Sequence, residues 1–299
     1  MPDIEPGYIP PSTDKPTPFP VRKNLSEDPK PKVEPLTGEE TAKVIAEMYD
    51  ILGPTNGCIL VNPNTVLAVA GLKGNADLPS PLLNDEEAEK IDMLNRQMES
   101  HGVHLGYPRN YRERLVTQLS FESLRGIEYK SRQTKLPGYF PYDSGTGRQG
   151  LREWQMRVQR NIRKINRDGR LSDETVGIYD DGVRLGYPDQ AIRDFADWYE
   201  EGTQDHSKLT EADILSVNTY AQQYKGNVPE FDYYPSSAEN PEIQEYIRKA
   251  RETLDGFYKS EWHIKTAQDP SFLAARKERD ERHERNVAHL QTEREQKRQ

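Results

Sequence analysis

A glycine-rich segment in the middle of the chain has residue types that could hold a phosphate group. Gly145, Gly147 and Gly150 match the pattern Gly-x-Gly-x-x-Gly and directly precede a predicted helix. Unhindered backbone amides at a helix N-terminus are suited to binding anions. The preceding residues 136–141 contain two prolines, however, and do not resemble the buried parallel strand of a dinucleotide-binding fold. A phosphate loop and an ordinary surface loop therefore remain as alternatives, and the sequence favours the ordinary loop.

The helix predicted to follow this loop is amphipathic and basic. Its apolar residues recur every three or four positions, which predicts a single buried stripe. The stripe consists of Leu151, Trp154, Val158, Ile162 and Ile165. The basic residues fall on the other faces of the helix, at Arg148, Arg152, Arg157, Arg160, Arg163, Lys164 and Arg167.

The charge of this helix is compatible with several kinds of contact. Residues 148–170 include eight basic and two acidic residues. Such a face could meet an acidic surface of a protein partner or of its own domain, bind RNA or another polyanion, or simply be solvated. The whole chain has a net charge of −9, whereas nucleic-acid-binding domains are usually basic. We therefore favour charge pairing with protein and keep RNA as the alternative.

The sequence contains no recognisable catalytic or metal-binding set. His101 and His104 are three residues apart, but Gly102 between them should break helical geometry. A zinc site needs three or four ligands, and no cluster of Cys and His completes one here. We therefore expect no catalytic residue, metal or cofactor, and leave open whether the protein is an enzyme.

Composition limits the compartment and the organisation of the chain. The single cysteine, Cys58, lies in an apolar run and is expected to be buried, so no disulfide framework is possible. No apolar run is long enough for a membrane span, and the first residues lack a signal-peptide core, which favours a cytoplasmic protein without membrane contact. Residues 1–36 hold ten of the 22 prolines and are expected to be disordered. Residues 37–265 are the expected core, and 266–299 a charged helical extension.

A heptapeptide occurs twice and predicts an internal duplication. Residues 102–108 and 182–188 agree at six of seven positions, including Gly, Tyr and Pro. We expect each copy to be a corner between two helices, within related units at about 88–165 and 168–257. Two such units would form one domain, because a solenoid needs three or more repeats.

Helix signals outnumber strand signals along the core, which predicts a mainly α fold with one small β-hairpin. Thr37 with Glu40 is the pattern of a capping box, and Asn84 with Glu87 opens another helix, which should end at Gly102. The last core helix is expected to end at Gly256. The hairpin is predicted from the apolar runs 58–61 and 65–72, which flank Asn-Pro-Asn.

The second corner resembles a family of uncharacterised, mainly archaeal proteins with the pattern Leu-Gly-Tyr-Pro-x-Cys-Cys and a later Pro-Cys-x-x-x-Cys loop. Residues 185–188 and Pro229 match this pattern. The cysteine positions are occupied by Gln190, Ala191, Glu230 and Tyr234, so the resemblance implies no thiol or metal chemistry here.

The function that the sequence favours is that of a non-enzymatic binding or scaffold protein. It would act through its termini and the basic helix at 151–167, with a protein partner or a second copy of itself. The alternative is an RNA- or nucleotide-binding protein, or an enzyme, with a phosphate site in the glycine-rich loop.

Overall fold

The computed structural model of the protein describes residues 33–79, 84–107, 118–165, 172–200 and 241–298. Over these residues the protein is mainly α-helical, as predicted, with one small antiparallel sheet. The apolar side chains form two clusters, which we call the first core, around the sheet, and the second core, around residues 147–165. None of the described helices combines the length and the apolar composition that a membrane span requires.

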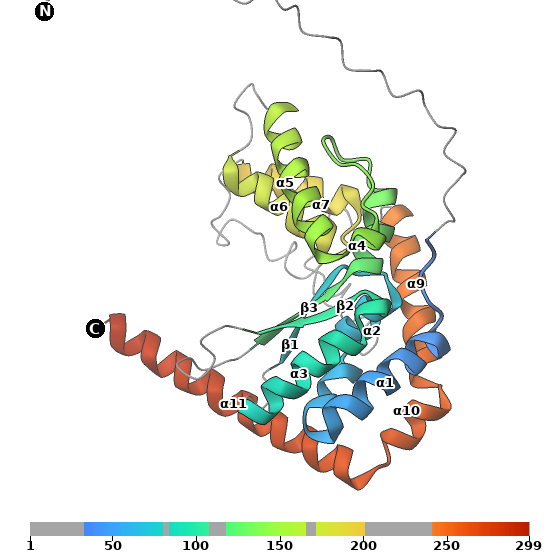
Figure 1. Ribbon diagram of the computed structural model, residues 1–299. Helices are drawn as coiled ribbons and strands as arrows, with labels where there is room; N and C mark the ends of the chain where they lie inside the picture. Colours follow the sequence, from blue (N-terminus) through green and yellow to red (C-terminus); the bar gives the residue numbers. More distant parts are fainter. Residues whose placement is uncertain (1–32, 80–83, 108–117, 166–171, 201–240, 299) are drawn as a thin grey trace, which may run out of the picture. The chain divides into compact units, whose positions relative to one another are not determined.

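The first core is built from the sheet and helices near both ends of the described chain. Its elements are α1 (Gly38–Gly57), η1 (Cys58–Val61), α2 (Pro63–Ala70), β1 (Asn75–Pro79), α3 (Asp85–Gln97), η2 (Glu99–His101), β2 (Val103–Gly106), β3 (Gln118–Ser123) and α9 (Pro241–Tyr258). Strand β3 lies between β1 and β2 and is antiparallel to both. Because side chains alternate along a strand, Leu105 and Phe121 are buried in the core, and Asn75, Glu122 and His104 form a polar row on the other face. Figure 1 shows α1, α2 and α3 on one side of the sheet.

The second core is helical. Its elements are α4 (Leu124–Gln133), η3 (Ser144–Thr146), α5 (Gly147–Ile165), α6 (Asp173–Arg184) and α7 (Asp189–Glu200), which Figure 1 shows grouped together. On α7, Ile192 and Ala196 are buried, whereas Phe195 is 37% exposed. Among the described residues, the apolar face of α7 is therefore only partly covered.

Two predicted helix starts are confirmed by their caps. Thr37 and Glu40 form the capping box of α1, in which the Thr37 amide donates to the Glu40 carboxylate at 2.8 Å. The Asn84 side chain accepts a hydrogen bond from the Glu87 amide at 2.9 Å and opens α3. After η2, Gly102 adopts the left-handed conformation (φ 67°) expected past a helix end.

The predicted β-hairpin over residues 58–61 and 65–72 is wrong, because η1 and α2 occupy these residues. Their apolar side chains are almost all buried, and a run without a polar face has no periodicity that separates a helix from a strand. The local signal was in the intervening residues. The Asn62 side chain accepts from the Asn64 amide at 2.9 Å, and Pro63 is the first residue of α2, which is typical of a helix start.

The two heptapeptides adopt different conformations, so the predicted common corner is wrong for the first copy. There Val103–Gly106 forms strand β2. In the second copy, residues 182–184 end α6, and Gly186 (φ 83°) turns the chain into α7. Residues 108 and 229–240, which carry part of the repeat, lie outside the described residues. The structure therefore does not show the predicted duplication of units 88–165 and 168–257.

Two glycines allow the two cores to meet backbone to backbone. A Cβ atom on Gly126 of α4 would lie 1.9 Å from the carbonyl oxygen of Lys73. A Cβ atom on Gly186 would lie 2.5 Å from the carbonyl oxygen of Leu72. Both positions therefore exclude any side chain, and the glycine of the second heptapeptide serves a long-range contact as well as a turn.

Gly256 does not end α9 as predicted. The helix continues to Tyr258, and a Cβ atom on Gly256 would lie 3.2 Å from the Cα of Gly38. The glycine instead allows the close crossing of α1 and α9. A helix end and a close helix crossing both favour glycine, and the sequence alone does not distinguish between them.

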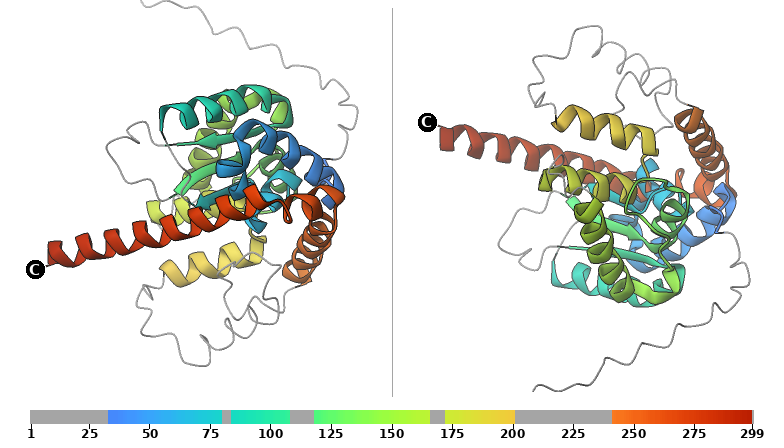
Figure 2. Two further views of the ribbon diagram at one scale, coloured as in Figure 1. Left: turned by 90° about the horizontal axis from the view of Figure 1, so that it is seen from below. Right: turned by 90° about the horizontal axis from the view of Figure 1, so that it is seen from above.

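The C-terminal segment is also helical, in α10 (Glu261–Thr266) and α11 (Pro270–Arg298). Phe272 and Ala275, in the first turns of α11, are buried in the first core. The Arg279 guanidinium donates to the carbonyl oxygen of Cys58 at 3.3 Å, and Cys58 itself is fully buried, as predicted. Both views in Figure 2 show the C-terminal part of α11 extending beyond the other helices.

A buried carboxylate on α6 makes the stability of the second core dependent on pH. Asp180 is 4% exposed; its Oδ2 accepts from Gln159 at 3.3 Å, and its Oδ1 has no hydrogen-bond partner in the described part of the chain. Burial raises the pKa of Asp180, although Arg184 and Gln159 oppose the rise. The folded state therefore disfavours the ionised carboxylate.

We expect Asp180→Asn to raise the midpoint of thermal unfolding at pH 7. Ionisation of the buried carboxylate lowers the stability of the folded state. This loss is absent at a pH where Asp180 is protonated in both the folded and the unfolded state. It grows as pH rises above the unfolded pKa of about 3.9 and is complete above the raised folded pKa. The gain from the substitution should therefore shrink at pH 3. Asp181→Asn is the control, because the Asp181 side chain is 68% exposed. Calorimetry at both pH values measures the difference, and an unchanged or lower midpoint for Asp180→Asn at pH 7 would contradict the interpretation.

Candidate binding surface on helix α5

The apolar stripe of α5 anchors the helix in the second core. Leu151, Trp154, Val158 and Ile162 are all at most 5% exposed, as the spacing predicts. Ile165, predicted to belong to the same stripe, is 59% exposed. It is the last residue of α5, and the helix ends without burying it. The opposite face of the helix is left for other contacts.

Trp154 fixes the position of α5 through the loop that connects it to α4. Its ring centroid lies 6.3 Å from that of Tyr139, 6.2 Å from that of Phe140 and 5.6 Å from that of Tyr142. The indole Nε1–H donates to the carbonyl oxygen of Phe140 at 2.9 Å, so the polar atom of this buried ring is satisfied. The connecting loop is thereby packed along the first half of the helix.

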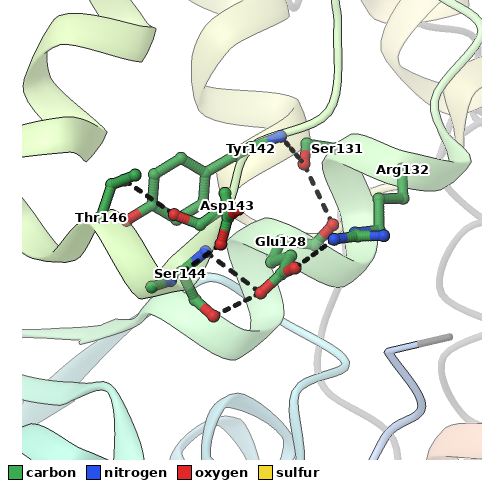
Figure 3. A network of polar contacts seen from close by, with 8 residues as sticks. Glu128, Ser131, Arg132, Tyr142, Asp143, Ser144 and Thr146 are labelled. Carbon is green, nitrogen blue, oxygen red and sulfur yellow. Dashed lines mark hydrogen bonds and ion pairs between the residues drawn. The ribbon is translucent and has the colours of Figure 1, made fainter. Parts of the chain in front are cut away.

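A buried polar network holds the start of α5 against α4 (Figure 3). Glu128, 5% exposed, accepts from the Ser144 amide at 3.1 Å, from the Ser144 hydroxyl and from the Arg132 guanidinium. The Tyr142 amide donates to the Ser131 hydroxyl at 2.8 Å, and that hydroxyl donates to the Glu128 carbonyl at 3.0 Å. Residues 142–144 are therefore fixed on α4 by both backbone and side-chain contacts.

The glycine-rich segment forms η3 and the first turn of α5. Gly147 has a φ of 63°, and a Cβ atom on Gly150 would meet the Thr146 side chain at 2.1 Å, so both glycines serve the turn. The Gly145 amide, which a phosphate loop would offer to an anion, donates to the Asp143 carboxylate at 3.0 Å. This arrangement suits an ordinary capped turn, the interpretation that the sequence favoured.

The basic residues of α5 divide into Arg148, which pairs with the sheet, and a separate exposed face. Arg148 turns to the sheet and pairs with Glu122 on β3, with Nε 2.9 Å from the carboxylate. The Arg157 guanidinium lies 4.9 Å from the Phe140 ring centroid. The exposed face, which we call the basic face, consists of Arg152, Arg157, Arg160, Arg163 and Lys164. Arg167 lies outside the described residues.

Four of the five residues of the basic face lack an ion pair with the part of the chain that the structure describes. In the part of the chain that the structure describes, no carboxylate forms an ion pair with Arg152, Arg157, Arg160 or Lys164. Met156, in the middle of the face, is 53% exposed. The face therefore presents positive charge around an exposed apolar side chain.

Sequence reasoning did not identify the residues that position this helix. Glu122 and Glu128 are separated from their partners Arg148 and Ser144 by 26 and 16 residues. No local pattern marks such pairs. Met156 also escaped notice, although its spacing from the apolar stripe places it on the opposite side of the helix.

Titratable groups near the inward end of α5 do not assemble a reactive centre. His104 lies opposite Glu122 in the sheet register, and burial, with Arg148 nearby, lowers the pKa of its imidazole. Among the described residues, no three His, Cys, Asp or Glu side chains are grouped as a metal site would require. The exposed residues of α5 are therefore the candidate site.

No family model, curated protein or solved structure matches this chain. The resemblance of residues 185–188 to an archaeal family therefore stays a prediction from those residues alone. The inference of function depends on the charge, exposure and packing of α5.

Proposed function

We propose that this chain is a binding protein that docks an acidic surface of a protein partner on the basic face of α5. The observation that carries the proposal is the separation of the two faces of α5. One face is buried in the second core, whereas the other presents exposed basic side chains, four of which (Arg152, Arg157, Arg160 and Lys164) form no ion pair with the described residues. Desolvated contacts with a partner's carboxylates would satisfy these charges.

The position of Arg148 supports an intermolecular role for the others. Arg148 forms an ion pair with Glu122 of β3, whereas Arg152, Arg157, Arg160 and Lys164 form none with the described residues. An own-domain role for the basic face would need further carboxylates opposite Arg152 and Arg160. The described part of the chain places none there.

An acidic protein suits the basic face better than RNA does. Met156 stands between Arg152 and Arg160, one helical turn from each, and is 53% exposed. Met and Arg are both enriched in protein interfaces.

We expect the combined variant Arg152→Glu, Arg160→Glu and Lys164→Glu to lose binding to a glutamate-rich helical peptide. Each exposed pair contributes up to about 1 kcal/mol, so three reversals should weaken binding by up to about 100-fold at low salt. Fluorescence anisotropy of the labelled peptide measures the change. Affinity of the unaltered chain should also fall as salt screens the charges.

The matched control is Lys43→Glu, Lys265→Glu and Lys277→Glu, which makes the same change in net charge at exposed residues of α1, α10 and α11. It should bind the peptide nearly as well as the unaltered chain. Single-stranded RNA of the same charge is the second probe. If RNA binds more tightly than the peptide and only the α5 variant loses this binding, the partner is a nucleic acid and not a protein. If both triple variants weaken binding equally, the binding surface is not on α5.

A further inference from the structure

We infer that the cavity between α4, the turn from α6 to α7, and α9 is a binding site for a compact organic anion. The site is separate from the basic face, because the described residues that line the cavity all lie outside α5. The cavity has a volume of about 200 Å³. Pockets for drug-sized ligands measure about 300–1,000 Å³, so this one is suited to a smaller molecule.

A buried ammonium group lines this cavity with part of its hydrogen-bonding capacity unused. Lys130 of α4 is 8% exposed, and its Nζ donates to the Asp189 carboxylate at 2.9 Å. An ammonium group has three N–H donors, and this carboxylate is the one acceptor that the described residues give Lys130. A buried donor without an acceptor costs free energy, so the remaining N–H groups favour an acceptor inside the cavity.

Two further lysines bring positive charge to the same cavity from other parts of the chain. Lys249 of α9, with its side chain 36% exposed, donates to the Tyr129 hydroxyl at 3.2 Å and lies 3.7 Å from Glu245. Lys135, which follows α4, is exposed, and its ammonium group forms no ion pair with the described residues. Because both lysines line the cavity, an anion inside it can be contacted from two sides of the chain fold, by α4 and by α9.

The buried carboxylate of the cavity is already satisfied within the chain. Besides Lys130, Asp189 accepts from the Thr134 hydroxyl at 2.8 Å and from the Lys135 amide at 2.6 Å. Burial alone would raise the pKa of Asp189, but the charge of Lys130 and these hydrogen bonds lower it overall, so the carboxylate is ionised at neutral pH. A cationic ligand would have to displace these donors from Asp189.

The exposed end of the cavity also carries more positive than negative charge. Glu245 accepts from the Nε and the Nη2 of Arg248, both at 2.8 Å, so its carboxylate has a partner outside the cavity. With Arg248 included, four basic side chains stand against the three lining carboxylates, Asp189, Glu242 and Glu245. The excess of one positive charge selects an anion over a cation or a neutral molecule.

The remaining lining describes the body of the ligand. It is apolar and partly aromatic, with Leu72, Tyr129, Pro188 and Tyr246. Gly186 closes the turn onto Leu72, since a Cβ atom there would lie 2.5 Å from the Leu72 carbonyl oxygen. A flat apolar ring with one oxyanion group, a carboxylate or a phosphate, matches both parts of this lining.

Benzoate and phenyl phosphate are suitable probes, because they share the ring and differ in the oxyanion. We expect at least one of them to shift the NMR signal of the Gly186 amide in the ¹⁵N-labelled full chain, with saturation and a dissociation constant of about 1 mM or lower. The tighter of the two identifies the head group. Benzyl alcohol, which has the ring without the charge, should bind at least about tenfold more weakly.

The variant Lys135→Gln and Lys249→Gln removes two positive charges from the cavity and leaves the buried Lys130–Asp189 pair intact. It should weaken binding of the anion at least about tenfold. The matched control is Lys259→Gln and Lys265→Gln, at exposed residues that do not line the cavity, and it should bind like the unaltered chain. Circular dichroism should show that both variants are folded.

The α5 variant with Arg152, Arg160 and Lys164 reversed should also bind the anion normally, which separates this site from the proposed function. Absence of saturable binding of both anions, equal binding of benzyl alcohol, or equal weakening in the cavity variant and its control would overturn the inference. Binding that shifts only α5 signals and is lost in the α5 variant would place the anion on the basic face. That result would overturn the cavity site and leave the proposed function standing.

Discussion

Gly126→Ala is expected to destabilise the protein by about 3 kcal/mol or more. The added methyl group would clash with backbone atoms, which cannot move aside as a flexible side chain can. The new Cβ atom would lie 1.9 Å from the carbonyl oxygen of Lys73, 2.5 Å from its carbonyl carbon and 3.0 Å from the amide nitrogen of Gly74. These are backbone atoms between α2 and β1, so the strain can be relieved only by separating α4 from that segment. Urea unfolding followed by circular dichroism measures the loss.

Gly177→Ala is the matched control for this prediction. Gly177 is also a helical glycine, in α6, but a Cβ atom there would have no neighbour within 4 Å. Alanine should therefore stabilise the helix by about 0.5–1 kcal/mol. If both variants shift the unfolding midpoint by the same amount and in the same direction, close packing at Gly126 is not what holds the two cores together.

Glu128→Ala is expected to cost about 3 kcal/mol, as is typical when one member of a buried ionic network is removed. The substitution would leave the Arg132 guanidinium, which is 26% exposed, without this carboxylate, and would free both Ser144 donors. The start of α5 would then lose its main polar attachment to α4. Proteolysis at residues 134–146 should accelerate together with the loss of global stability.

Glu153→Ala separates this effect from the loss of any glutamate. Glu153 is exposed on α5, and its carboxylate accepts only from Gln149, at 3.4 Å, among the described residues. Its removal should change the free energy of unfolding by no more than about 0.5 kcal/mol. Equal stability of the two variants would show that the network in Figure 3 does not stabilise the protein.

Local sequence patterns predicted those parts of the fold that depend on local contacts. The caps at Thr37 and Asn84 are made by residues three positions apart, and the buried stripe of α5 follows from helical spacing. The error at residues 58–72 arose where nearly every side chain is buried, so that spacing carried no information. The Asn62-Pro63 helix start was the better guide there, because its mechanism is also local.

Conformation set by tertiary contacts could not be predicted in this way. Nearly identical heptapeptides form strand β2 in one place and the end of α6 in the other. The first copy gains strand partners in β3, and the second gains a backbone contact between Gly186 and Leu72. The candidate site was also only partly predictable. The sequence identified the basic residues of α5. It did not show that Arg148 lies apart from the basic face, because Arg148 pairs with Glu122, which is far away in the chain.

The claim that the basic face of α5 serves a partner and not the fold is tested most directly by the free energy of unfolding of the Arg152→Glu, Arg160→Glu and Lys164→Glu variant at physiological salt. Exposed charges without ion pairs among the described residues should be replaceable, so the value should lie within about 0.5 kcal/mol of that of the control with Lys43, Lys265 and Lys277 reversed. A loss of more than about 1.5 kcal/mol relative to that control would mean that these side chains already stabilise their own chain, since exposed pairs contribute less than this. That result would contradict the proposed binding surface.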